Sequence, residues 1–196
     1  MNIKQKKSVQ AINYFARKKE SNSINRLKLI KLLWLSDRYH VMKYGRFMLR
    51  DRYVAMPHGP VASMTKDISE GYGDEYSPEY IRPKGSLSID SIGEVDLDFL
   101  SKTEREVMDF IWIKFGEYSQ FELRDISHHY PEWKRFEEKL KKTKSSYPMK
   151  ISDFFVKPEN EDNAIYEVFR GLEAVIENSK ETLERTSIFS NSNITY

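Results

Sequence analysis

Residues 23–45, SINRLKLIKLLWLSDRYHVMKYG, are the stretch that decides the fold. The hydroxyl of Ser23 can cap the first turn of a helix, and Gly45 can adopt the left-handed backbone conformation that ends one. Between them, apolar residues recur at helical spacing over an unusually wide stripe. They are Ile24, Leu27, Leu29, Ile30, Leu32, Leu33, Trp34 and Leu35. Because so wide an apolar face has to be covered by other elements, we expect this helix at the centre of the domain.

The segments around this helix predict a second helix and a small sheet. Residues 8–19 place their apolar side chains at helical spacing. Residues 52–56 alternate in the way that is typical of a strand. Residues 87–89 and 95–97 are short apolar runs on either side of a glycine. We expect these two runs to be strands that complete a small antiparallel sheet with residues 52–56.

A corner follows the first predicted strand. The run Pro57-His58-Gly59-Pro60 contains two prolines and a glycine, which break regular structure. Pro60 suits the first position of a helix, because its missing amide would have no partner there. We therefore expect a short helix from Pro60 to about residue 71, and a loop from there to residue 85.

Two capping boxes predict a pair of helices joined by a tight turn. Ser101 and Glu104 have the spacing at which a serine oxygen and a glutamate carboxylate each satisfy a free amide of the first turn. The helix that they open ends at Gly116. Ser119 and Glu122 repeat the pattern and open a shorter helix. The pair resembles a helix-turn-helix unit.

The C-terminal third predicts two more helices. Pro131 fits the first turn of a helix that reaches Leu140, and helical spacing returns over residues 162–186. Residues 187–196 are rich in Ser, Thr and Asn and are expected to be a frayed tail. The predicted fold is mainly α: a single compact helical domain over residues 1–186, with a small antiparallel β-sheet and the helix-turn-helix-like unit.

The composition excludes several classes of function. The chain has 32 basic and 30 acidic residues and a net charge of +2, a field too weak to indicate nucleic acid or an anionic membrane as the partner. It has no cysteine, which excludes disulfides, thiolate nucleophiles and cysteine-based zinc sites. We see neither a secretory signal nor the roughly 20 apolar residues that cross a bilayer. A cytoplasmic protein without a membrane partner is expected.

The histidines do not suggest a metal site. His40, His58, His128 and His129 lack the close spacing that would place two ligands on one face of a helix. Nearby aspartates supply no recognisable nucleophile and base pair. We therefore expect no metal, no cofactor and no enzymatic activity.

Two blocks resemble the SocA-like antitoxins, the Panacea domain family. The first is LKLIKLLWLSDRYHVMKYGR at residues 27–46, followed by DRYVAMPHGPV at 51–61; the second is LSKTEREVMDFIWIKFGEYSQFELRDISHHYPEW at 100–133. With the N-terminal helix, the resemblance covers about residues 8–136. It implies a protein that neutralises a cognate toxin by binding it directly, and that in some relatives delivers the toxin to a protease.

The resemblance suggests which residues shape the domain, and the predicted corner suggests which residues contact a partner. The motif residues that we expect to be structural are Leu32, Leu33, Asp37, Tyr39, His40, Gly45, Gly59, Gly116, His128 and Trp133. The candidate partner-binding surface is the corner and the strand before it, where side chains and backbone groups can be presented together. Its residues are Arg46, Arg52, Tyr53, Met56, His58 and Pro60.

Two alternative functions remain open. The helix-turn-helix-like unit could bind DNA as a transcriptional regulator, although its second helix offers Glu122 and Asp125 beside Arg124, and carboxylates repel phosphate. The chain could also be a phage or prophage protein that binds host proteins and has no dedicated toxin.

Overall fold

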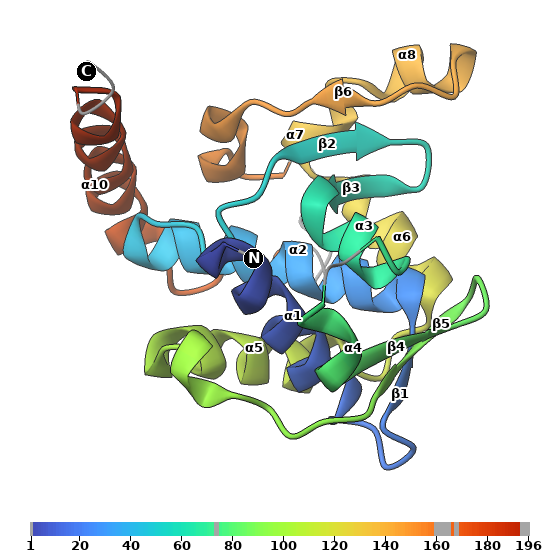
Figure 1. The fold of residues 1–196 in the computed structure, drawn as a ribbon. Coiled ribbons are helices and arrows are strands. Elements are labelled where there is room, and N and C mark those ends of the chain that lie inside the picture. The colour runs from blue at the N-terminus through green and yellow to red at the C-terminus, as the bar shows by residue number, and fades with distance from the viewer. Residues whose placement is uncertain (1, 73–74, 159–165, 167–168, 193–196) are drawn as a thin grey trace.

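The computed structural model describes residues 2–72, 75–158, 166 and 169–192 (Figure 1). The chain is mainly helical and carries two small antiparallel sheets. The predicted class, a mainly α domain, is confirmed, but the expected single sheet is wrong. The elements are α1 Ile3–Ala16, β1 Ser23–Asn25, α2 Arg26–Tyr44, β2 Tyr53–Met56, β3 Gly59–Ala62, α3 Ser63–Ser69, α4 Ser77–Tyr80, β4 Ile81–Lys84, β5 Ser88–Ser91, η1 Leu97–Phe99, α5 Lys102–Phe115, α6 Gln120–Ser127, α7 Pro131–Lys134, α8 Glu137–Lys142, β6 Tyr147–Pro148, η2 Ile151–Phe155 and α10 Glu173–Ser192.

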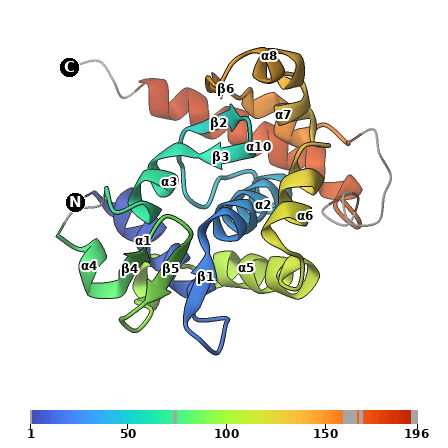
Figure 2. The ribbon, with the colours of Figure 1, turned by 90° about the vertical axis from the view of Figure 1, so that its right-hand side faces the viewer.

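Helix α2 is the centre of the fold, as its wide apolar stripe predicts. Every residue from Lys28 to Met42 is buried. Figure 2 shows α2 nearly end-on, with α1, α3, α5 and α6 around it. Gly45 ends the helix at φ +64°, where an added Cβ would lie 2.4 Å from the backbone oxygen of Ser179 in α10. The glycine therefore serves both the left-handed turn and the close approach of α10.

The start of α2 differs from the prediction. Ser23 does not cap the helix, because residues 23–25 form β1 and pair with β5, with Ile24 opposite Ile89. Asn25 takes the cap position instead, and its side chain accepts a hydrogen bond from the amide of Lys28 at 3.1 Å.

The sheets are divided differently from the expectation. β2 pairs with β3 in a hairpin and with β6, while β5 pairs with β1 and β4. Residues 52–56 therefore do not join residues 87–97 in one sheet. The predicted strand at 95–97 is absent, and a short 3-10 helix follows at Leu97.

The helix expected at Pro60 begins later. The turn Pro57-His58 reverses the chain, so that Pro60 lies in edge strand β3 opposite Ala55. Helix α3 starts at Ser63, where the Asp51 carboxylate accepts hydrogen bonds from the amides of Met64 (3.0 Å) and Thr65 (2.8 Å). This carboxylate, from the chain before β2, satisfies the first turn of α3.

Two further segments depart from the prediction. The loop expected over residues 71–85 contains α4 and β4. The single helix expected from Pro131 to Leu140 is divided into α7 and α8. By contrast, both predicted capping boxes are present, at Ser101 before α5 and at Ser119 before α6.

The C-terminal helix α10 packs against the second half of α2 (Figure 1). Phe169 and Leu172, which lie just before the start of α10, are buried. The predicted start at residue 162 lies outside the described residues. The helix runs to Ser192, past the end at residue 186 that the sequence predicts.

Candidate partner-binding groove

A groove of about 350 Å³ opens at the N-terminal end of α2. Its floor is formed by Leu27 and Ile30 of α2 together with Val61 of β3. α3, the turn before β5 and the first residues of α6 complete the walls, and Figure 2 looks toward this end of α2. The volume lies at the lower end of the range of ligand pockets, roughly 300–1,000 Å³, so the groove can hold a few side chains of a partner.

The tip of the β2–β3 hairpin forms one wall. Met56, Pro57 and His58 line the groove, and the side chain of His58 is exposed. The indole Nε1 of Trp133 donates a 2.8 Å hydrogen bond to the backbone oxygen of Met56, and the ring of His128 stacks on Trp133 at 3.7 Å. The motif residues of the second block thus hold the hairpin of the first block in place.

Gly59 lets this hairpin lie close to α2 and α6. Its φ is +100°, and an added Cβ would lie 2.4 Å from Ser127 Oγ and 2.6 Å from Lys31 Nζ. The Lys31 amine donates a 2.8 Å hydrogen bond to the backbone oxygen of Pro60. A larger residue at position 59 would therefore displace the wall of the groove.

Two large apolar side chains stand at the rim. Leu87, in the turn before β5, is 70% exposed, and Phe121, in the first turn of α6, is 55% exposed. Large apolar side chains gathered around a groove are typical of a protein interaction site. Aromatic residues are also frequent among the few that dominate binding energy.

The charged side chains of the groove are mostly basic. Arg26, Lys31 and Lys66 line it with one carboxylate, Glu70. Burial lowers the pKa of Lys31 well below its usual value, and the nearby charge of Arg124 lowers it further. Because Lys31 is fully buried, its amine carries much less charge than an exposed lysine.

The six residues predicted for the partner surface do not lie together in the structure. Met56 and His58 line the groove. Tyr53 and Pro60 are buried, so their assignment to a surface is wrong. The Tyr53 hydroxyl donates a hydrogen bond to Asp37, and Pro60 faces the Lys31 amine.

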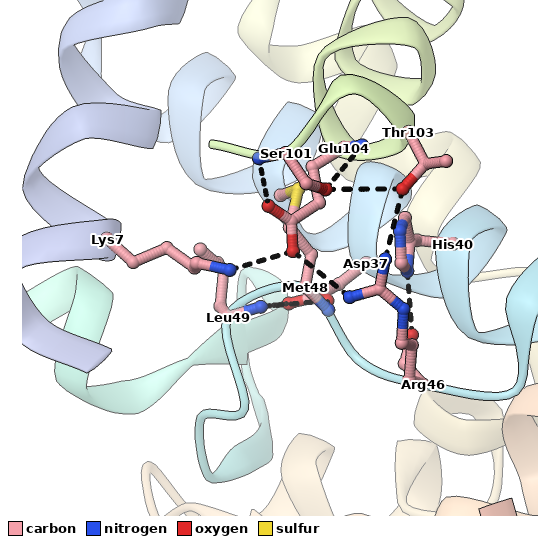
Figure 3. Close-up of polar contacts among 9 residues, drawn as sticks. All are labelled: Lys7, Asp37, His40, Arg46, Met48, Leu49, Ser101, Thr103 and Glu104. Atoms are coloured by element: carbon pink, nitrogen blue, oxygen red, sulfur yellow. Dashed lines mark hydrogen bonds and ion pairs between the residues drawn. The ribbon is translucent and has the colours of Figure 1, made fainter. Parts of the chain in front are cut away.

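Arg46 and Arg52 lie away from the groove. Arg52 is exposed beside Ser63 at the start of α3. Arg46 donates to Thr103 Oγ1 at 3.1 Å and lies 3.6 Å from the Glu104 carboxylate, as Figure 3 shows. Neither arginine therefore belongs to the groove that Met56 and His58 line.

The contacts in Figure 3 fasten the loop between α2 and β2. Asp37 accepts hydrogen bonds from the amides of Met48 and Leu49, and His40 Nδ1 lies 2.7 Å from the backbone oxygen of Arg46. Burial raises the pKa of Asp37 to about 7, although its three hydrogen-bond donors lower it. Asp37 and His40 therefore hold this loop, which is a structural role.

Glu104 joins the same loop to α1. Its carboxylate accepts from Lys7 Nζ at 2.8 Å and from the amide of Ser101. Burial raises the pKa of Glu104, but the Lys7 ammonium and the Ser101 donors outweigh it and hold the pKa below its usual value. The capping box of α5 is thus also a link between helices.

The remaining motif residues lie in the core. Leu32 and Leu33 are fully buried, and Tyr39 packs on Phe110 with 4.6 Å between ring centroids. The backbone oxygen of Gly116 accepts a hydrogen bond from the Lys28 ammonium, which also donates to the backbone oxygen of Tyr118 at 2.8 Å. The cation therefore satisfies carbonyls at the end of α5.

Sequence reasoning missed most of the groove. Leu27 and Ile30 were predicted to be core, and Leu87 was expected in a strand of the same sheet as residues 52–56. Phe121 directly follows the first residue of α6, and its position beside the Ser119 cap is the one signal for its exposure. Five separate segments build the groove, and no local pattern joins them.

Among the described residues, neither α6 nor the histidines show an arrangement that favours binding of DNA or of a metal ion. Glu122 and Asp125 are exposed on α6, and Arg124 Nη2 pairs with Asp125 at 2.7 Å, so α6 offers little free positive charge to DNA. Within the described ranges, no group of three or more His, Asp or Glu side chains is arranged to hold a metal ion. None of the described helices combines the length and apolar character that crossing a bilayer requires.

The comparisons agree with the two motif blocks. The model of the family described as antitoxin SocA-like, Panacea domain, matches residues 29–134, which is more than half of the chain. The matched segment contains most of the groove, from Ile30 in α2 to Phe121 in α6. Comparison with curated proteins and with solved structures gives no match. The chain belongs to the family of SocA-like antitoxins that share the Panacea domain.

Proposed function

We propose that this chain is an antitoxin that neutralises a cognate toxin by binding it directly in the cytoplasm, without catalysis or a cofactor. The observation that carries the proposal is the groove at the N-terminal end of α2, with Leu87 and Phe121 exposed at its rim. The family to which the chain belongs supports a toxin as the partner. The groove would be the centre of an interface of roughly 800 Å² on each partner.

The groove is suited to this role because a rigid scaffold holds its walls. Trp133, His128 and Lys31 fix the hairpin tip, and the Asn25 and Ser119 caps fix the two helix ends. A site that is already formed binds a partner without a large loss of conformational entropy.

Co-expression tests the proposal. Each gene adjacent to the one that encodes this chain is expressed alone and together with it. We expect one of them to stop growth alone, to be tolerated with this chain, and to co-purify with it. Phe121→Asp should abolish the rescue, whereas Ile113→Asp, at a still more exposed apolar position on α5, should not. Absence of any rescued toxin would contradict the proposal.

The same strains distinguish blocking from delivery to a protease. We propose that binding itself silences the toxin, so the toxin's half-life should be unchanged when this chain is present. A half-life that shortens only with this chain would show that the chain acts as a proteolytic adaptor.

A further inference from the structure

The charges at the groove are unbalanced. Glu70 is shared by two cations: Arg26 Nη1 lies 3.9 Å and Lys66 Nζ 2.5 Å from its carboxylate. Lys66 also lies 3.7 Å from the more exposed Asp67. Lys31 has no carboxylate within ion-pair distance in the part of the chain that the structure describes. Because buried Lys31 carries little charge, the lining holds two cations, Arg26 and Lys66, against one carboxylate, Glu70.

One hydrogen-bond donor at the groove also lacks an acceptor within the described part of the chain. Arg26 Nε is buried and has no hydrogen-bond partner among the described residues, although Nη2 donates to the backbone oxygen of Gly85 at 2.7 Å. A buried donor without an acceptor costs about 1–3 kcal/mol. Because this atom is shielded from solvent, a partner's acceptor reaches it only when the Arg26 side chain turns toward the groove. The guanidinium as a whole is partly exposed and is the group that a partner meets first.

The end of α2 adds positive potential. The helix has 19 residues, its N-terminus is at the groove, and its first turn contains no acidic residue. The partial positive charge at a helix N-terminus favours a nearby anion. An anionic group of the partner is thus favoured by the helix end, by the basic lining and by the Arg26 guanidinium.

We propose that the groove takes an acidic, apolar segment of the toxin. One or two large apolar side chains of this segment pack between Leu27, Ile30 and Phe121, and a carboxylate of the same segment binds Arg26. In the free protein Glu70 occupies part of the place of that carboxylate. This inference rests on the proposed function and specifies the chemistry of the toxin segment.

Three substitutions separate this inference from a purely apolar contact. Arg26→Gln removes the main ligand of the carboxylate and should weaken binding about tenfold or more. Lys66→Glu reverses a second charge and should weaken it by a similar factor. Glu70→Gln frees both cations for the partner and should tighten binding about threefold to tenfold. A gain in affinity cannot result from misfolding.

The probe is a phage-displayed library of random nine-residue peptides, selected on the full chain and counter-selected on Phe121→Asp. Dissociation constants of enriched peptides are then measured by fluorescence polarisation. Peptides that pair Asp or Glu with Leu, Phe or Trp are expected, with the order of affinity Glu70→Gln, wild type, Arg26→Gln. Glu177→Gln, which makes the same charge change on exposed α10, is the control and should leave affinity unchanged.

Enrichment of basic or uncharged peptides, equal affinities in the three variants, or no enrichment at all would overturn the inference. The toxin found by co-expression supplies a separate outcome. If the wild-type chain rescues growth and the Arg26 and Glu70 variants bind the toxin equally well, the inference is wrong and the proposed function stands. If no toxin is rescued, the proposed function fails instead.

Discussion

The pair of Arg38 in α2 and Glu132 in α7 gives the sharpest test of how the two motif blocks are held together. Both side chains are fully buried, and Arg38 Nε donates to Glu132 Oε1 at 2.8 Å. The guanidinium also donates to the backbone oxygen of Val156 at 3.0 Å and lies over the rings of Tyr130 and Phe169 at 4.5 and 4.6 Å. Burial raises the pKa of Glu132, and the charge of Arg38 opposes the rise.

Glu132→Gln leaves the Arg38 cation buried without its counter-ion. Breaking a buried pair in this way costs about 3–5 kcal/mol, a large part of a typical unfolding free energy of roughly 5–15 kcal/mol. With a urea m-value of about 3 kcal/mol/M, the unfolding midpoint should fall by about 1–1.7 M. Urea titration followed by tryptophan fluorescence measures this shift.

The double variant Arg38→Met with Glu132→Leu is the control. Glu132 Oε2 has no hydrogen-bond partner among the described residues, so the pair is not fully satisfied. Replacing both charges with apolar side chains should therefore cost only about 1 kcal/mol, because such replacements are often neutral. A midpoint unchanged in Glu132→Gln, or a double variant as unstable as the sum of the single ones, would refute this reasoning.

Three further substitutions test other contacts. In the wild type, the unfolding free energy should fall by at most about 4 kcal/mol as pH rises from about 4 to about 7. The reason is that burial raises the pKa of Asp37 to about 7, so the folded chain holds a proton that the unfolded chain releases. Asp37→Asn should remove this pH dependence. Urea titrations at low and neutral pH measure how the unfolding free energy of each protein changes with pH. Burial lowers the pKa of His128 to about 4, which has the opposite effect, but this effect is the same in both proteins and cancels in their difference. An equal change with pH in the variant and the wild type would contradict the prediction. Gly59→Ala should cost about 2 kcal/mol or more by thermal unfolding, because its Cβ would meet Ser127 and Lys31, whereas Gly85→Ala, with open space around it, should cost only about 1 kcal/mol; equal losses would argue against the close approach. Lys28→Met should leave the carbonyls at the end of α5 without their donor and cost about 1–3 kcal/mol, with faster amide exchange at that end of the helix; unchanged exchange would exclude this role.

The helices were largely predictable, because local patterns determine them. The apolar stripe of α2 and the capping boxes at Ser101 and Ser119 act within a few residues, and each is present in the structure. The sheets were not predictable in the same way. The pairing of Ile24 with Ile89 joins segments far apart in the sequence, and no periodicity specifies it.

The errors at the candidate site have a similar origin. Pro60 was expected to start a helix, but the Pro57-His58 turn and the Asp51 cap move the start of α3 to Ser63. Tyr53 was expected at the surface because alternation does not tell which face of a strand is covered. Of the six predicted residues only Met56 and His58 line the groove, whose other residues come from segments that meet only in the folded chain.

Binding of the purified chain to the toxin identified by co-expression is the most direct test of a partner-binding antitoxin. Isothermal titration calorimetry should give a dissociation constant below about 1 µM for the wild type and a value at least about tenfold weaker for Phe121→Asp. Circular dichroism should show that the variant is folded. A wild-type chain that binds no such toxin, or a folded Phe121→Asp that binds it as tightly as the wild type, would contradict the account.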